Sequence, residues 1–218
     1  MKKIFINISA LICLLTCAGE FISLCILGKY YPGYSQLKNT MSQLGVSVSP
    51  VSSEISLWWI ISGLLFTIFG IGVWIAFMGR GKPARLASLL IILYGLGEGI
   101  GSGIFKADLV PSGITISYII HDIFGGVGVL AVLILPLAMR KVFSVEERPG
   151  FYRFSGILFF TGILTVFLFL FRYYPDQDMF LAKYKGFWQR LFMLNTYIYF
   201  TVIAVIMLTG KGTFNTED

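Results

Sequence analysis

The chain has 218 residues, of which 56% are hydrophobic and only 13% are charged. An average soluble domain carries about 25% charged residues, so the composition excludes an ordinary soluble protein and indicates an integral membrane protein. The formal net charge of +6 comes without a basic stripe or an RNA-binding aromatic motif. We therefore expect no nucleic-acid partner and interpret the excess Lys and Arg as topology signals.

Six apolar segments follow one another along the chain, at residues 4–28, 55–78, 85–105, 114–139, 152–171 and 190–209. Each reaches the length of about 20 residues that a spanning helix needs. Only a helix satisfies its own backbone in lipid, so we predict an all-α fold. The prediction is a polytopic membrane bundle of six transmembrane helices that forms one domain over residues 1–218. The first segment imitates a signal peptide, but it is long enough to span, and we expect it to be retained.

Lys and Arg are distributed unevenly between the two ends of the predicted bundle. One end collects ten of the 17 and the other collects seven, and the ten are concentrated in the short turns at 79–85 and 140–153. Short basic turns stay in the cytoplasm. We therefore predict that both termini are cytoplasmic and that the longer loops, 29–54 and 172–189, face outward.

Metal and cofactor sites are not expected. His121 is the single histidine of the chain, so a multi-histidine metal or haem site cannot be assembled. The three cysteines, Cys13, Cys17 and Cys25, all fall in the first apolar segment and form no C-x-x-C motif. We predict neither a metal nor a cofactor.

Glycine is concentrated in the third apolar segment, in the stretch YGLGEGIGSG at 94–103. Small residues spaced four apart let membrane helices approach closely. We interpret the glycines as a tight contact between segments 85–105 and 114–139. A second interpretation, compatible with the first, is that they leave room for a ligand near Glu98.

Three acids and the histidine lie within apolar segments, namely Glu20, Glu98, His121 and Asp122. A charge at the centre of a membrane helix costs about 2.5–3.5 kcal/mol on insertion scales, so each of these side chains must have a partner or a functional role. With a rise of about 1.5 Å per residue, all four lie roughly 10–12 Å from the same end of the bundle. We expect three helices to bring these groups to one level, with Glu98 and His121 within hydrogen-bonding reach directly or through one water.

His121 and Asp122 are neighbours in sequence but not around the helix. Consecutive residues are about 100° apart on a helix, so the two side chains should face different partners. We expect one of them to face the helix at 85–105 and the other to face a different partner.

Three stretches of the sequence support a family resemblance: YPGYSQLKNTMSQLG, FKADLVPSGITISYIIHDIFGG and GFWQRLFML. They resemble a Ser-x-Leu-Gly stretch, an aromatic-x-x-Asp before a helix with an early His, and a Gly-x-x-Gln-Arg helix start. All three occur in the bacterial domain-of-unknown-function family numbered 998, and the resemblance covers most of the chain. It implies a multi-pass protein of the bacterial inner (cytoplasmic) membrane, but no biochemical activity. The matching positions are Ser42, Leu44, Gly45, Asp108, His121, Gln189 and Arg190.

These residues together define a candidate site. We predict an outward-opening pocket lined by Glu20, Glu98, His121 and Arg190, with Asp108 at its rim. Arg190 would either pair with Asp108 or hold a phosphate or carboxylate of the ligand. The remaining candidates are Ser42, Asp122 and Gln189.

The function predicted for this pocket is binding of a small amphiphile or a lipid headgroup, so membrane lipids are the expected partners. Two alternatives stay open. One is a metal-independent enzyme in which Glu98 or Asp122 performs acid–base chemistry with His121. The other is a structural or partner-binding membrane subunit, in which the polar residues only fix how the helices pack.

Overall fold

A computed structural model describes residues 1–111 and 113–210. Within these residues six helical spans are long and apolar enough to cross a membrane. The spans are α1 (Lys2–Lys29), α2 with η2 (Ser52–Phe77 and Met78–Arg80), α3 with η3 and α4 (Lys82–Tyr94, Gly95–Gly101 and Ser102–Ile104), α5 (Ile116–Val142), α6 with η4 (Pro149–Leu170 and Phe171–Tyr173), and α8 (Lys185–Leu208). Each of the six predicted segments overlaps one of them, which confirms the predicted fold class.

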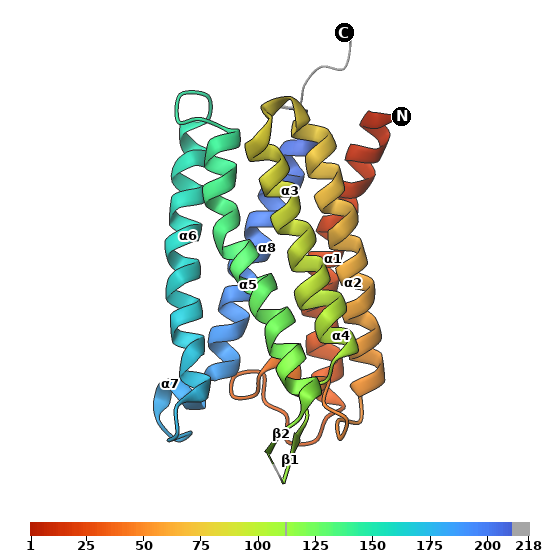
Figure 1. Cartoon of the computed structure of the whole chain (residues 1–218), viewed down its shortest axis with the longest axis vertical. Helices are drawn as coiled ribbons and strands as arrows, with labels where there is room; N and C mark the ends of the chain where they lie inside the picture. Colours follow the sequence, from red (N-terminus) through yellow and green to blue (C-terminus); the bar gives the residue numbers. More distant parts are fainter. Residues whose placement is uncertain (112, 211–218) are drawn as a thin grey trace.

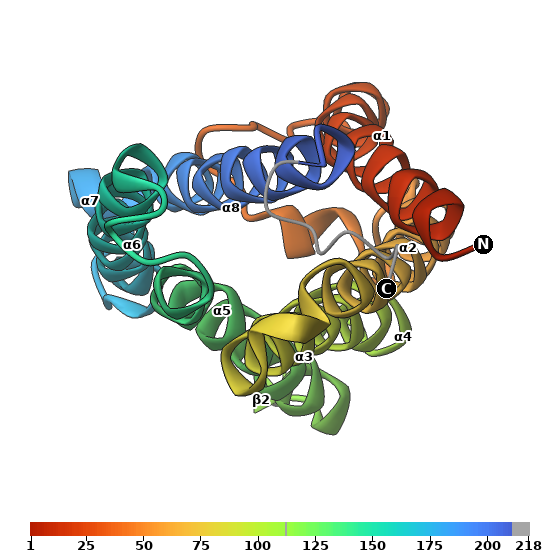
Figure 2. The ribbon, with the colours of Figure 1, turned by 90° about the horizontal axis from the view of Figure 1, so that it is seen from above.

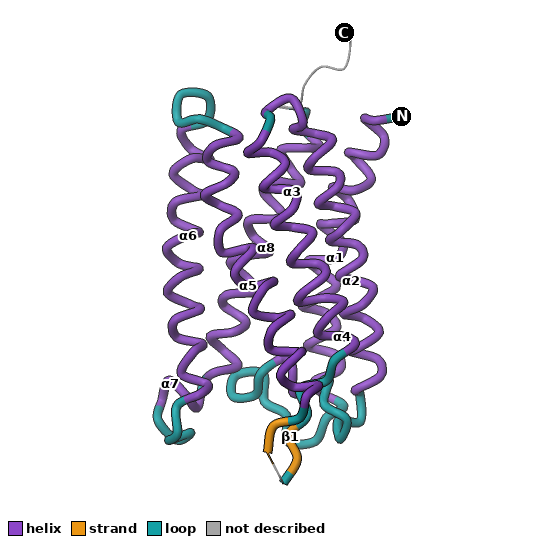
Figure 3. The backbone as a smooth tube through the Cα atoms, viewed as in Figure 1, coloured by secondary structure: helices purple, strands orange, loops and turns teal. Residues whose placement is uncertain are grey.

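The helices pack side by side in a ring, seen from above in Figure 2. Going round, α1 contacts α2, α2 contacts α3, α3 contacts α5, α5 contacts α6, α6 contacts α8, and α8 returns to α1. The start of α1 and the end of α8 lie at the same end of the bundle (Figure 1). The longer connections lie at the opposite end, which we call the loop end (Figure 3). They comprise residues 30–51, residues 105–111 with 113–115, and residues 174–184.

The loop end carries four short elements. These are η1 (Met41–Leu44), the two-stranded hairpin of β1 (Leu109–Val110) and β2 (Gly113–Ile114), and α7 (Phe180–Lys183). The strands pair antiparallel, with Leu109 opposite Ile114. The segment 30–51 is fastened to two helices: Gln36 donates to the backbone oxygen of Leu24 at 2.6 Å, and the backbone N–H of Phe187 donates to Leu37. These bonds hold the loop across the end of the bundle.

The glycine-rich part of the third span is a π-helical segment, η3, whose two faces touch different neighbours. A Cβ added to Gly97 would lie 2.4 Å from the backbone oxygen of Phe124 on α5. A Cβ added to Gly99 would lie 2.3 Å from Cα of Gly63 on α2. The predicted close contact between the third and fourth spans is therefore present, and a second one with α2 accompanies it. π-Helical turns are frequent at functional sites, and this one carries Glu98.

A cluster of aromatic rings fills the middle of the bundle. It consists of Phe66 and Phe69 on α2, Tyr94 on α3, and Tyr197 and Phe200 on α8. The Phe66 ring lies 5.3 Å from that of Phe200 and 5.4 Å from that of Tyr94, centroid to centroid, which are favourable edge contacts. Three rings of this aromatic cluster, those of Phe66, Tyr94 and Tyr197, also line the cavity described below.

Candidate functional site

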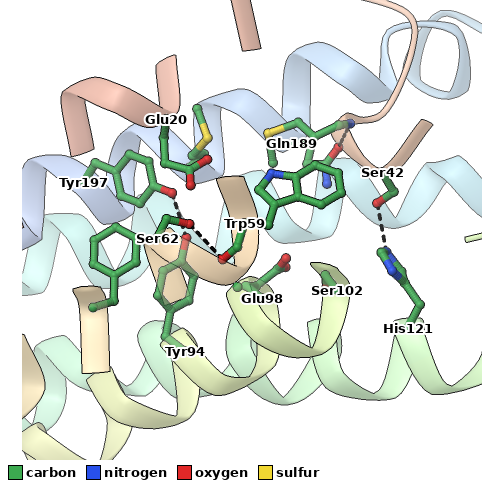
Figure 4. Close-up of a pocket in the computed structure, with 14 residues that line it drawn as sticks. Glu20, Ser42, Trp59, Ser62, Tyr94, Glu98, Ser102, His121, Gln189 and Tyr197 are labelled. Carbon is green, nitrogen blue, oxygen red and sulfur yellow. Dashed lines mark hydrogen bonds between the residues drawn. The ribbon is translucent and has the colours of Figure 1, made fainter. Parts of the chain in front are cut away.

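A small buried cavity lies between the aromatic cluster and the loop end (Figure 4). Its volume is about 30 Å³, which is room for one or two water molecules. Five helical spans and η1 contribute to its lining. The lining residues are Glu20, Met41, Ser42, Trp59, Ser62, Phe66, Tyr94, Glu98, Gly99, Ser102, His121, Gln189, Met193 and Tyr197.

Two carboxyl groups dominate the chemistry of this cavity. Glu20 from α1 and Glu98 from η3 both point into it (Figure 4). Glu20 is 5% exposed and lies beside Ser62 and the indole of Trp58. Ser62 itself donates to a backbone oxygen at 3.1 Å. No lysine or arginine is among the described residues that line the cavity, so the lining offers no cation to balance the two carboxyl groups.

His121 is fixed at the edge of the cavity by two hydrogen bonds. Its Nδ1 lies 2.7 Å from the backbone oxygen of Phe105, and its Nε2 lies 3.1 Å from Oγ of Ser42. A carbonyl oxygen can only accept, so Nδ1 carries the ring proton of the neutral side chain and Nε2 accepts the hydroxyl proton of Ser42. The partners thus select one tautomer.

Gln189 positions η1 from the opposite wall. Its Oε1 accepts the backbone N–H of Met41 at 2.8 Å, and this bond determines which end of the amide is which. The amide Nε2 then remains as a donor, and it makes no hydrogen bond to any residue in the described part of the chain. Gln189 is 7% exposed and lines the cavity together with Ser42, so this donor is available to a group that enters the cavity.

A second, larger space lies at the loop end. We call this space, of about 730 Å³, the vestibule. Its lining combines polar side chains such as Tyr118, Asp122 and Arg172 with the apolar Leu109 and Val110 of the hairpin. Ser42 lines both the vestibule and the buried cavity. The hydrogen bond from Ser42 to His121 therefore lies at the junction of the two spaces.

The two acids of the vestibule are held by neighbouring groups. Asp108 accepts hydrogen bonds from the backbone N–H and the hydroxyl of Ser47, at 2.7 and 2.6 Å. Partial desolvation raises the pKa of Asp108, but the hydrogen bonds from Ser47 outweigh it, so this pKa lies below its ordinary value. Asp122 forms an ion pair with Arg172 at 3.1 Å and accepts from the Tyr173 hydroxyl at 2.9 Å.

Arg190 fastens the first loop to α8 and does not line either space. Its guanidinium donates to Gln36 Oε1 at 2.8 Å and to the Tyr34 hydroxyl at 2.6 Å. It also donates to the backbone oxygens of Asn39 and Gly186, each at 2.9 Å. Four protein acceptors occupy this side chain.

The structure places the eight predicted site residues in three groups. Glu20, Ser42, Glu98, His121 and Gln189 line the buried cavity, whereas Asp108 and Asp122 line the vestibule. We expected Arg190 to line the pocket as well, but it lies outside both spaces and binds the loop at residues 34–39 instead.

Of the expected contacts, the pairing of Arg190 with Asp108 is wrong. The direct hydrogen bond between His121 and Glu98 is absent, whereas a link through one water stays a prediction. Arg190 does not pair with Asp108, because each binds the groups that fold against it locally. His121 makes no direct hydrogen bond to Glu98, because both of its ring nitrogens are taken by other groups. The expectation that His121 and Asp122 face different partners is confirmed, although the partner from the third span is the carbonyl of Phe105, just beyond its helical end.

Sequence reasoning missed the residues that complete the cavity from α2 and α8. Tyr197 accepts a hydrogen bond from the Tyr94 hydroxyl at 3.0 Å, and both tyrosines line the cavity. A signal was present for Tyr197, because Gln189, Met193 and Tyr197 are spaced four apart and so share one helix face. Ser62 carried no comparable signal, since serine is common in membrane helices.

The acids and His of residues 1–111 and 113–210 include no group of three or more that could hold a metal ion.

Residues 15–206 match the family model described as protein of unknown function (DUF998). The chain belongs to the DUF998 family. The match to DUF998 extends from within α1 to within α8 and so includes every residue that lines the two spaces. No curated protein and no solved structure matches the chain.

Proposed function

We propose that this DUF998 protein binds a small amphiphile that enters from the loop end. The polar end of the ligand occupies the buried cavity, and its apolar part extends through the vestibule toward the membrane. The observation that carries the proposal is that one residue, Ser42, lines both spaces. A polar network that only holds helices together would be closed and fully paired. Here the carboxyl groups face a cavity that adjoins a larger one.

The hairpin beside the vestibule suits a molecule that is partly apolar. The hairpin exposes Leu109 (68%) and Ile114 (63%), and Ile116 at the start of α5 is 77% exposed. Leu109 also lines the vestibule, next to polar groups such as Asp122. An amphiphile held at the membrane surface would meet apolar side chains first and polar ones deeper in.

The buried cavity favours a ligand whose polar end is a positively charged amine. Glu20 and Glu98 supply two carboxyl groups, and an ion in a low-dielectric interior is costly unless a counter-charge accompanies it. Trp59, Phe66 and Tyr94 line the same cavity, and the faces of aromatic rings attract cations. A single ammonium group is about as large as the water that this volume holds. Amine recognition therefore combines charge, size and ring contacts.

Thermal unfolding in detergent tests this proposal with two probes of equal chain length. Dodecylamine should raise the melting temperature of the wild type, because a ligand at free concentration L that binds only the folded state stabilises it by RT ln(1 + L/Kd). Dodecanol, which lacks the charge, should raise it less. Glu20→Gln and Glu98→Gln keep the side-chain shape and should abolish the difference between the probes. Asp178→Asn, which alters a side chain that is 95% exposed, should preserve it.

Two results would count against the proposal. Equal shifts with both probes would contradict amine recognition but leave a site for amphiphiles. No shift with either probe, together with a loss of stability in the Glu20 and Glu98 variants, would show that the polar residues serve only to hold the helices together.

A further inference from the structure

We propose that Ser42 and His121 are a nucleophile and its general base, and that the protein cleaves a carboxylic ester in the amphiphile. This inference rests on the proposed function, because the vestibule and cavity would hold the two ends of the substrate. It concerns a reaction, whereas the proposed function concerns binding alone. The ester would lie at Ser42, where the two spaces meet.

The first support is the direction of the hydrogen bonds. Ser42 Oγ donates to Nε2 of His121 at 3.1 Å, while the opposite ring nitrogen donates to the Phe105 carbonyl at 2.7 Å. An activated serine needs this arrangement, with an acceptor nitrogen facing the hydroxyl and a third group that orients the ring. In the Ser-His-Asp triad that third group is a carboxylate, whereas here it is a backbone carbonyl. We therefore expect slower turnover than in enzymes with the full triad.

The second support is that η1 holds the nucleophile in place. Gln189 binds the backbone N–H of Met41, the residue before Ser42, and the Gln43 side chain accepts from the backbone N–H of Thr40. Arg190 fastens the preceding loop through Asn39. Ser42 thus sits on a short helix whose start is fixed, as positioning of a reacting group requires.

The third support is a donor placed to stabilise negative charge. Gln189 lines the cavity together with Ser42, and its Nε2 donates to no described residue. When a nucleophile adds to an ester, negative charge develops on the carbonyl oxygen, and a preorganised amide donor there lowers the barrier. Ser42, His121 and Gln189 thus supply nucleophile, base and oxyanion donor around one space.

The reaction balances with water as the sole co-reactant. Ser42 Oγ bonds to the carbonyl carbon as its proton passes to Nε2 of His121, and the resulting oxyanion accepts a hydrogen bond from Gln189. The carbon–oxygen bond to the alcohol then breaks, and His121 returns the proton to the leaving oxygen. Water from the vestibule attacks the acyl-serine in the same way. An ester and water become a carboxylic acid and an alcohol, with no change of oxidation state.

Covalent labelling of the full chain in detergent tests the inference. A fluorophosphonate carrying a fluorescent group should label the wild type once per chain, as read from intact mass. Ser42→Ala should abolish labelling, and His121→Ala should slow it by about 10²–10⁴-fold. Ser53→Ala, an exposed serine in α2, is the matched control and should label like the wild type.

A second measurement separates a chemical role of Gln189 from a structural one. Gln189→Glu keeps an oxygen for the Met41 N–H but removes the amide donor. Hydrolysis of p-nitrophenyl butyrate should then lose about 10²–10³-fold in kcat with KM nearly unchanged, the usual effect of removing one oxyanion donor. Equal kcat in the wild type and Gln189→Glu would remove Gln189 from the mechanism.

The two proposals can fail separately. In one outcome, dodecylamine raises the melting temperature of the wild type while the fluorophosphonate fails to label it, or still labels Ser42→Ala. Either result would overturn the role of Ser42 as nucleophile and leave amine binding intact. Labelling that depends on Ser42 without any dodecylamine shift would support the nucleophile and contradict amine binding.

Discussion

Gly63 of α2 and Gly99 of η3 pack backbone against backbone, so closely that a Cβ on Gly99 would lie 2.3 Å from Cα of Gly63. This contact brings η3 against α2 at the level of the buried cavity. Glu98 precedes Gly99, and Trp59 lies one turn before Gly63, so both side chains reach the same space. The closeness of the two backbones therefore determines the shape of the site.

Substitution of Gly99 should be destabilising. Gly99→Ala puts a methyl group where backbone atoms already lie, and overpacking of this kind costs about 1–3 kcal/mol. Gly126→Ala is the matched control, because a Cβ there meets nothing within 4 Å. It should be neutral or stabilise by up to about 1 kcal/mol, as alanine is the better helix former. In detergent, Gly99→Ala should melt at a lower temperature than Gly126→Ala. Equal melting temperatures would contradict the close contact between Gly63 and Gly99.

Loss of Arg190 should loosen the loop that carries Ser42. Arg190→Ala removes four hydrogen bonds, including those to Tyr34 and Gln36. A hydrogen bond to a charged group contributes about 1.5–3 kcal/mol net, and such contributions from one side chain do not add in full. We expect a net loss of about 2–4 kcal/mol in unfolding free energy. Arg190→Lys should recover little, because an ammonium cannot reproduce the fork of the guanidinium.

Limited proteolysis would locate the effect of Arg190. Cleavage within 30–51 should speed up in Arg190→Ala but not in Arg153→Ala, an exposed arginine of α6. Unchanged proteolysis in both variants would show that the hydrogen bonds to residues 34–39 do not hold the loop.

The bond between Asp108 and Ser47 should make stability depend on pH on the acid side. The pKa of Asp108 is below its ordinary value in the folded protein, so its contribution is present above about pH 4 and is lost as the pH falls through the folded pKa. The side chain is partly exposed, so we expect less than about 1 kcal/mol. The difference in melting temperature between wild type and Asp108→Asn should shrink from pH 7 to pH 3. Ser47→Ala should remove most of this dependence on pH. If the difference in melting temperature between wild type and Asp108→Asn stays constant with pH, the stabilising role of the Asp108–Ser47 bond is contradicted.

The loop end should face away from the cytoplasm, because the turns at 79–85 and 140–153 are short and basic. The test is labelling by a membrane-impermeant maleimide in intact cells, in a background in which the three native cysteines are alanine. Val48→Cys, 84% exposed at the loop end, should react, and Lys82→Cys should react only after lysis. The opposite pattern would invert the protein and place the vestibule on the cytoplasmic side.

The sequence by itself determined the six spans and the level of the polar groups. Helix length follows from bilayer thickness, and the rise per residue is constant, so counting residues placed Glu20, Glu98 and His121 at one depth. Their presence in the lining of one cavity agrees with that count. The resemblance added Ser42 and Gln189, which no depth argument could reach because both belong to the loop end.

Only the tertiary structure decided which groups meet. The rotation of each helix about its axis depends on contacts such as Gly63 with Gly99, and the path of a loop depends on bonds between residues far apart in sequence, such as Gln36 with Arg190. For this reason His121 faces Ser42, 79 residues earlier, and not Glu98. Depth is a property of one helix, whereas pairing across the bundle is a property of all six.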